Sequence, residues 1–383
     1  MKLTNDSGFP ATLARAQLLY RDLMLATVVV KASFQVAEDG GVTRVDTEEQ
    51  LAVSEADVTT DLGTIDGDVV PIKPGCDLAL LGHARSPHAE RAVDRLLVDL
   101  RVGTFSRPVT VFGDRNWTDS SRSPKMTAPA PFTAIPLTYD RSYGGSAVAA
   151  AKLVTPYSQN PDGSGYVRLR EHVAGTRLPN LEESDQLISS WEQTPLAAGT
   201  APLPRVSSLR LDGGGFAVDI EKEMVQLTPP AFSFAHPRMK LARYPGGETL
   251  TVTSVTVGGP WTFTLPVMHF TVAICLGSIR YELPLVVDTL CLFPDYRRFF
   301  ILARRACVYQ LLPERLRTIT VFSGEATAGT ATTNIAEQRR AMAPIVPILP
   351  AAAPEALPLS FDSLLELYPL TSILETLPLC PSD

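Results

Sequence analysis

Two acidic residues of the chain, Asp114 and Asp140, are each followed by an arginine and stand close to an aromatic residue. Glycosidases place two carboxylates about 5–10 Å apart, one as general acid and the other as base or nucleophile. Asp114 and Asp140 could form such a pair in a carbohydrate-directed hydrolase. The alternative is that each Asp–Arg dipeptide contributes an ion pair that braces a turn, and this is the interpretation we favour.

Signals for other chemistry are missing from the sequence. The five histidines form neither an H-E-x-x-H motif nor a close cluster with cysteines, which gives zinc no support. There is no G-x-x-x-x-G-K-[ST] loop and no G-x-S-x-G elbow, and the glycines at 213–215 follow no βαβ pattern. We therefore expect a non-enzymatic protein with no catalytic residue, no cofactor and no metal.

Composition narrows the class further. The net charge of −7 and the pI near 5.4 argue against a nucleic-acid-binding protein, which needs a basic face. Five cysteines without a C-x-x-C motif indicate free thiols in a reducing compartment. Residues 1–6 lack the apolar segment of a secretory signal, and five prolines interrupt the apolar stretch 342–359. We predict a cytoplasmic protein without a membrane span.

Hydrophobic patterns predict mainly β-structure. Residues 23–36 form a β-branched apolar run, and 42–45 can pair back with it through the turn Asp39-Gly40-Gly41. Residues 96–102 alternate as a half-buried strand does, and 107–112 are the expected hairpin partner. The first 115 residues then form a β-meander. Further short strands are predicted at 78–81, 249–257, 261–265, 271–276, 281–287, 289–293, 299–303 and 306–311.

The predicted strands are interrupted by a segment that lacks a regular strand pattern. Between about 117 and 205, proline, glycine and asparagine recur among aromatic residues, which predicts an ordered, loop-rich layer over the sheets. We expect antiparallel sheets arranged as a sandwich or barrel over residues 1–320, with two lobes at 1–205 and 206–320 as an alternative.

An Ala/Pro-rich linker and C-terminal tail should follow at 321–383. Ser360 can cap a short apolar helix there, carrying Phe361, Leu364, Leu365 and Leu367. Such a tail either packs on its own domain or docks a partner.

An ordered series of turn-forming motifs resembles the bacterial family called domain of unknown function 2169. The series covers about residues 1–320 and consists of residues 5–10, 24–34, 70–77, 81–84, 112–117, 136–145, 160–166 and 178–182. The motif residues that we single out are Gly113, Asp114, Arg115, Trp117, Tyr139, Arg141, Gly144, Gly145, Asn160, Pro161, Gly165, Tyr166, Pro179 and Asn180. The family often has a Trp–Arg pair near its last strands, where this chain has Ala303-Arg304-Arg305.

The physical roles expected of these residues are mostly structural. The glycines permit tight turns, and Asn160-Pro161 and Asn180 can initiate turns and cap backbone groups. Four aromatic residues are of the kind that anchor protein interfaces, although most should fill the space between loop layer and sheet: Trp117, Tyr139, Tyr143 and Tyr166.

The resemblance implies a bacterial protein encoded with type VI secretion genes. Family members are thought to act as adaptors or chaperones that bring a toxic effector to the valine–glycine-repeat spike or its PAAR-type tip. The family has no established catalytic residues, so none is assigned. An adaptor that binds an effector, spike or tip protein is the leading hypothesis. The alternatives are the hydrolase using Asp114 and Asp140, and a structural component of the secretion particle.

Overall fold

The protein is mainly β in the computed structural model, which confirms the predicted fold class. The structure describes residues 2–17, 23–70, 73–121, 123–149, 153–211, 216–219, 224–227, 232–276, 279–310 and 317–324. The predicted tail helix with Phe361, Leu364, Leu365 and Leu367 lies outside these residues. Across the described ranges, no helix has the length and apolar character needed to cross a membrane.

The largest sheet has seven strands in the order β19-β7-β24-β25-β3-β2, with β4 also pairing with β3. Its strands are β2 (Ala11–Gln17), β3 (Leu23–Val36), β4 (Val42–Arg44), β7 (Cys76–Leu80), β19 (Lys240–Leu241), β24 (Val286–Phe293) and β25 (Arg298–Gln310). β7 and β24 are parallel, and the other neighbours are antiparallel. β3 is buried continuously from Ala26 to Phe34, which explains its unbroken apolar run.

Two smaller sheets complete the body. The five-stranded sheet has the order β16-β10-β9-β20-β21, and the four-stranded sheet has the order β1-β26-β22-β23. The first comprises β9 (Arg95–Val102), β10 (Phe105–Phe112), β16 (Leu181–Glu183), β20 (Thr249–Val252) and β21 (Trp261–Thr264). The second comprises β1 (Lys2–Asp6), β22 (Phe270–Leu276), β23 (Ile279–Pro284) and β26 (Arg317–Ser323). The predicted hairpins β3–β4 and β9–β10 are both confirmed.

The expected N-terminal meander is wrong, because distant strands pair with one another. β1 pairs with β26, β3 with β25, and β7 with β24. Strands from before and after residue 205 therefore share sheets, as β9 and β20 also do. Residues 299–303 and 306–310, predicted to lie in two strands, belong to the single strand β25, since it pairs with β3 along its whole length.

A common apolar core joins the three sheets. Phe299 on β25 stacks on Phe34 of β3 at a centroid distance of 5.0 Å and on Phe263 of β21 at 5.1 Å. Phe9, in the turn after β1, packs edge-on against Phe270 of β22 at 5.7 Å. Aromatic side chains bury large areas and gain further from such contacts. This row of rings is therefore a principal cohesive element between the sheets.

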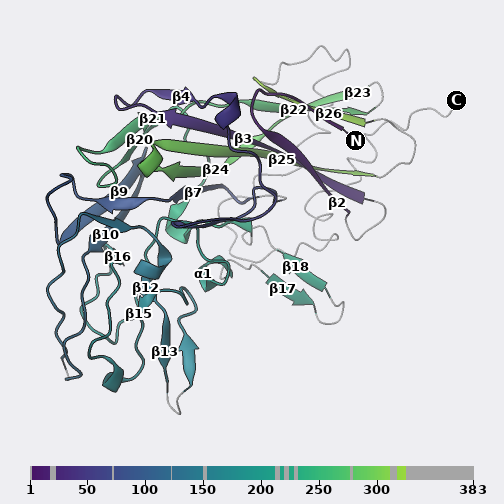
Figure 1. Cartoon of the computed structure of the whole chain (residues 1–383). Coiled ribbons are helices and arrows are strands. Elements are labelled where there is room, and N and C mark those ends of the chain that lie inside the picture. The colour runs from purple at the N-terminus through teal and green to yellow at the C-terminus, as the bar shows by residue number, and fades with distance from the viewer. Residues whose placement is uncertain are drawn as a thin grey trace.

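The remaining elements are short. The strands are β5 (Val58–Thr60), β6 (Gly63–Ile65), β8 (His83–Arg85), β11 (Ala134–Pro136), β12 (Tyr143–Gly144), β13 (Ser146–Val148), β14 (Val154–Pro156), β15 (Ser164–Gly165), β17 (Phe216–Asp219) and β18 (Met224–Leu227). The helices are α1 (Ser208–Leu211) and the 3-10 turns η1 (Thr47–Glu49), η2 (Tyr139–Arg141), η4 (Arg170–His172), η6 (Pro237–Met239) and η7 (Pro294–Tyr296). β12, β13 and β15 belong to a loop layer that extends to one side of the large sheets, with β13 at its far end (Figure 1).

Candidate functional site

The motif at 112–117 leaves β10 as an extended segment whose side chains alternate between solvent and interior. Asp114 is exposed, whereas Arg115 and Trp117 are buried. Gly113 passes so close to the loop layer that a Cβ there would lie 1.7 Å from the carbonyl oxygen of Ala130. Any larger residue would push these two segments apart.

Asp114 and Arg115 do not pair with each other. Arg115 Nη2 donates to Glu182 Oε1 at 2.5 Å and to the carbonyl oxygen of Pro179 at 3.0 Å. Its guanidinium also lies 3.8 Å from the centroid of the Phe112 ring. Burial raises the pKa of Glu182 and outweighs the opposing effect of Arg115. The motif is braced by an ion pair, as expected, but its acidic partner comes from β16.

Asp114, which is exposed, belongs to a polar cluster centred on the buried side chain of Asn180. Asn180 Nδ2 donates to Asp114 Oδ1 and to the carbonyl oxygen of Phe112, each at 3.0 Å. Arg177 Nη2 donates to the same Asp114 oxygen at 2.8 Å. Hydrogen bonding from Asn180, with the charges of Arg177 and Arg141, lowers the pKa of Asp114 despite partial desolvation.

The second carboxylate of the hydrolase hypothesis lies beside the first. Arg141 lies between them, with Nη1 3.9 Å from Asp114 Oδ1 and Nε 3.5 Å from Asp140 Oδ2. Both carboxylates are 62% exposed. A glycosidase general acid needs a raised pKa, and the lowered pKa of Asp114 does not suit that role. Both residues therefore have a structural explanation as arginine partners.

Asn160 is fully buried and connects the motifs at 136–145 and 160–166 through hydrogen bonds. Its Nδ2 donates to the carbonyl oxygens of Tyr139 at 2.7 Å and Tyr143 at 3.2 Å. Its own carbonyl accepts from the amide of Gly145 at 2.8 Å. Gly144 has φ +153°, and a Cβ there would lie 2.0 Å from that carbonyl oxygen. Asn160 and the two glycines therefore fix the turn that precedes β13.

The candidate aromatic residues mostly fill space rather than face solvent. Trp117 and Tyr143 are 2% and 3% exposed and belong to a second apolar cluster beneath the loop layer. Tyr166 packs at its edge, 6.4 Å from the ring of Tyr143, and Tyr139 is buried in the main core. The remaining motif residues contribute to the same junction. Gly165 of β15 pairs with Gly144, and Pro179 lies against it. Pro161 follows Asn160 in the turn and is half-buried.

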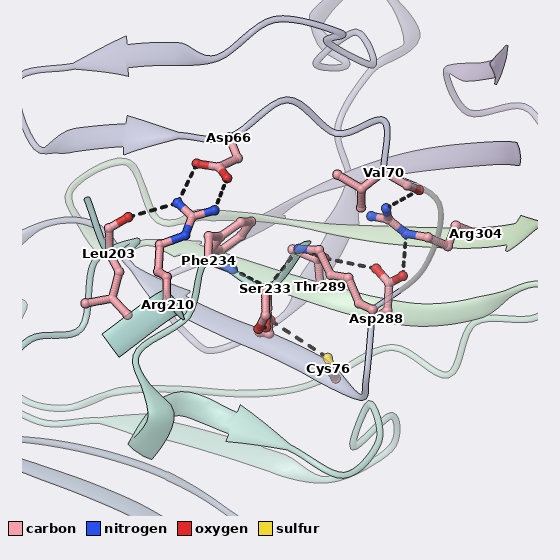
Figure 2. Close-up of polar contacts among 12 residues, drawn as sticks. Asp66, Val70, Cys76, Leu203, Arg210, Ser233, Phe234, Asp288, Thr289 and Arg304 are labelled. Carbon is pink, nitrogen blue, oxygen red and sulfur yellow. Dashed lines mark hydrogen bonds and ion pairs between the residues drawn. The ribbon is translucent and has the colours of Figure 1, made fainter. Parts of the chain in front are cut away.

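Sequence patterns missed a network of buried charges at one end of the seven-stranded sheet. Lys73 Nζ donates to Asp77 Oδ2 at 2.8 Å and to Thr289 Oγ1 at 3.0 Å. Asp77 also accepts from the Ser233 hydroxyl and, at 3.0 Å, from the Phe234 amide. Thr289 in turn donates to Asp288, which pairs with Arg304. Figure 2 shows Ser233, Thr289, Asp288 and Arg304 converging in this network.

Burial disfavours ionisation of both acids of this network, but the net shifts of their pKa values are opposite. Desolvation opposes ionisation of Asp77, but Lys73, Ser233 and the Phe234 amide together hold its pKa below the usual value. Burial raises the pKa of Asp288, and Arg304 offsets only part of that effect. The sequence signal available was the motif at 70–77, which contains both Lys73 and Asp77. Within the part of the chain that the structure describes, no group of His, Cys, Asp and Glu could hold a metal ion.

A further buried ion pair lies between β10 and β16. Arg107 Nη1 and Nη2 donate to the two carboxylate oxygens of Glu183, each at 2.5 Å, and Nη2 also donates to the Gly199 carbonyl at 3.1 Å. Arg238 Nη1 reaches the same carboxylate at 2.8 Å. His236 is fully buried beside this pair, and Arg238 donates its amide to His236 Nδ1 at 3.0 Å.

The environment of His236 predicts a pH-dependent stability. Burial, with the charge of Arg107, lowers the pKa of His236 to about 3, whereas an unfolded histidine titrates near 6.5. Below pH 6.5 the unfolded chain therefore takes up a proton that the folded chain does not. Stability should fall with pH by up to about 1.4 kcal/mol per unit over that window.

A His236→Asn variant isolates this effect, since asparagine can still accept from the Arg238 amide. We expect the free energies of unfolding of the two proteins to diverge by about 2 kcal/mol between pH 7 and pH 5, as measured by urea denaturation. The carboxylates titrate in both proteins and cancel in the difference. Parallel pH profiles would mean that His236 accepts a proton in the folded state.

One element of the loop layer exposes apolar side chains. Val148 of β13 and Val154 of β14 are cross-strand partners that are 37% and 58% exposed, and Leu153 beside them is 63% exposed. Among the described strands, β13 and β14 pair only with each other. The hairpin thus combines unpaired strand edges with an exposed apolar end, features that favour association with another protein.

Comparison with known proteins identifies a family but no characterised relative. A family model described as "Uncharacterized protein conserved in bacteria (DUF2169)" matches residues 22–304, which is well over half of the chain. Searches of curated proteins and of solved structures gave no match.

Proposed function

This chain belongs to the bacterial family DUF2169, and from that premise we propose that it is a non-enzymatic adaptor or chaperone for type VI secretion. It binds a secreted effector in the bacterial cytoplasm and helps to load it onto the spike or the PAAR-type tip. The site of contact is the hairpin β13–β14 at the far end of the loop layer. The exposure of Val148, Leu153 and Val154 on that hairpin is the observation that carries the proposal.

The motif residues support this role because they hold the base of the hairpin. Gly145, directly before β13, accepts from the Tyr157 amide at 2.8 Å and donates to the Asn160 carbonyl at the same distance. The Tyr157 hydroxyl donates to the Pro195 carbonyl at 3.0 Å. A hairpin fixed at its base can meet a partner with little loss of conformational entropy.

Replacing Val154 by aspartate should weaken effector binding at least about tenfold, because central apolar contacts of an interface often contribute more than 1.4 kcal/mol each. The fold should be retained, since the side chain is 58% exposed. The measurement is a pull-down and titration of the full chain with effector and spike proteins encoded by adjacent genes. Val257→Asp is the matched control, because Val257 is 50% exposed and lies between β20 and β21.

Three outcomes would contradict the proposal. Equal binding by both variants would remove the hairpin from the interface. An unchanged secretion level after deletion of the gene, with no effector bound, would exclude an adaptor. Recovery of the protein with the spike in the secreted fraction would favour a structural component of the particle.

A further inference from the structure

A surface hollow of about 440 Å³ lies beside the β3–β4 hairpin of the seven-stranded sheet and the end of β21 in the five-stranded sheet. Its lining comes from the β3–β4 hairpin and from the segment after β21, and it includes Phe34, Val42, Arg44, Leu265 and Val267. A hollow of this size with a largely apolar lining is suited to bind side chains of a peptide. Val267 is 62% exposed at its rim.

Two features of the lining can engage a further segment of chain. β4 pairs with β3 alone among the described strands, so its outer edge is available to another segment. Arg44 lies over the Phe9 ring, 4.0 Å from its centroid, and forms no ion pair with any residue in the described ranges. The hollow therefore offers an apolar floor, an open strand edge and a positive charge.

The described part of the chain ends close to this hollow. The last described residue, Gly324, donates its amide to the His269 carbonyl at 2.8 Å and accepts from Thr271 Oγ1 at 3.0 Å. His269 is two residues from Val267, which corresponds to about 7 Å of extended chain. Residues 325–340 can span up to about 55 Å, so whatever follows them easily reaches the rim.

The segment 341–383 has a composition that matches the lining. It is rich in Leu, Pro and Ala and contains no Lys, Arg or His, and its charged residues are Glu355, Asp362, Glu366, Glu375 and Asp383. We propose that the segment 341–383 docks in the hollow of its own chain, with apolar side chains on Phe34, Val42 and Leu265 and an acidic side chain facing Arg44. This inference does not depend on the proposed function.

Photocrosslinking of the full chain tests the proposal. With p-benzoylphenylalanine in place of Val267, we expect cross-links to peptides of 341–383, identified by mass spectrometry. Mixing ¹⁵N-labelled and unlabelled protein distinguishes links within one chain from links between two chains. The same group at Val257 serves as the control, which should cross-link without capturing those peptides.

The contribution of Arg44 is tested in the same experiment. Arg44→Glu should lower the yield of tail cross-links about two- to fivefold, as expected for an exposed ion pair that is replaced by repulsion. Arg91→Glu, another exposed position, should leave the yield unchanged. Links between different chains, links from Val267 to other peptides, no links from Val267, or an unchanged yield in Arg44→Glu would each overturn the proposal.

Discussion

A Glu183→Leu variant should unfold with a free energy about 3–5 kcal/mol lower than the unchanged chain, the usual cost of leaving one member of a buried ion pair without its partner. Glu183 and Arg107 have side chains that are 0% and 2% exposed. Without the carboxylate, Arg107 keeps only the Gly199 carbonyl among its present acceptors. Urea denaturation followed by tryptophan fluorescence measures the change.

A neighbouring acid provides the matched control. Asp185 accepts from the same Arg238 Nη1 as Glu183, also at 2.8 Å, but its side chain is 61% exposed. Asp185→Asn should therefore change the free energy of unfolding by no more than about 1 kcal/mol. Equal losses in the two variants would show that burial does not determine the energy of this cluster.

A double variant separates the pair from its surroundings. In Arg107→Leu/Glu183→Leu no unpaired charge is left between β10 and β16, and apolar replacements of a buried pair are often close to neutral. We expect the double variant to be more stable than Glu183→Leu alone. A loss equal to the sum of the single losses would mean that the two side chains act independently.

The local sequence pattern was sufficient to predict individual strands but not to predict which strands pair with one another. The unbroken apolar run of β3 and the alternation in β9 predicted both strands within a residue of their observed ends. The pairing of β3 with β25 joins segments more than 250 residues apart in the sequence, at Arg298 and Gln35 for example. No local periodicity encodes such a contact, so the predicted meander failed there.

The same limit of sequence-based prediction applies to the side chains of the candidate site. The motif at 112–117 was identified from the sequence, but the acid that pairs with Arg115 was not. Successive residues of an extended chain point to opposite sides, so Asp114 faces solvent while Arg115 faces the interior. The two acids of β16 also point to opposite sides but are both buried, and Glu182 pairs with Arg115 while Glu183 pairs with Arg107. Alternation predicts which neighbours cannot pair, whereas only the fold supplies the partner.

The network around Asp77 allows a second prediction: loss of the Asp77 carboxylate should lower stability more than loss of the Lys73 ammonium group. Asp77→Leu should lower the free energy of unfolding by about 3–5 kcal/mol, because it removes the acceptor of three donors: Lys73, the Ser233 hydroxyl and the Phe234 amide. Lys73 would keep only Thr289 Oγ1 and the Phe234 ring, whose centroid is 3.9 Å away. The measurement is again equilibrium denaturation at pH 7.

Lys73→Met should cost less, about 2–3 kcal/mol, because Asp77 then retains two of its donors. The decrease in the free energy of unfolding caused by Lys73→Met should also depend on pH. In the unchanged chain the pKa of Asp77 is lowered, so its contribution is present above an unfolded pKa near 3.9 and is lost only in stronger acid. Without Lys73, burial should raise that pKa, and the buried carboxylate can take up a proton in mild acid. The gap between Lys73→Met and the unchanged chain should therefore narrow as the pH falls from 7 towards 4. A gap that is constant with pH would show that Ser233 and the Phe234 amide keep Asp77 ionised without Lys73. A greater loss for Lys73→Met than for Asp77→Leu would show that these two donors do not stabilise the buried carboxylate.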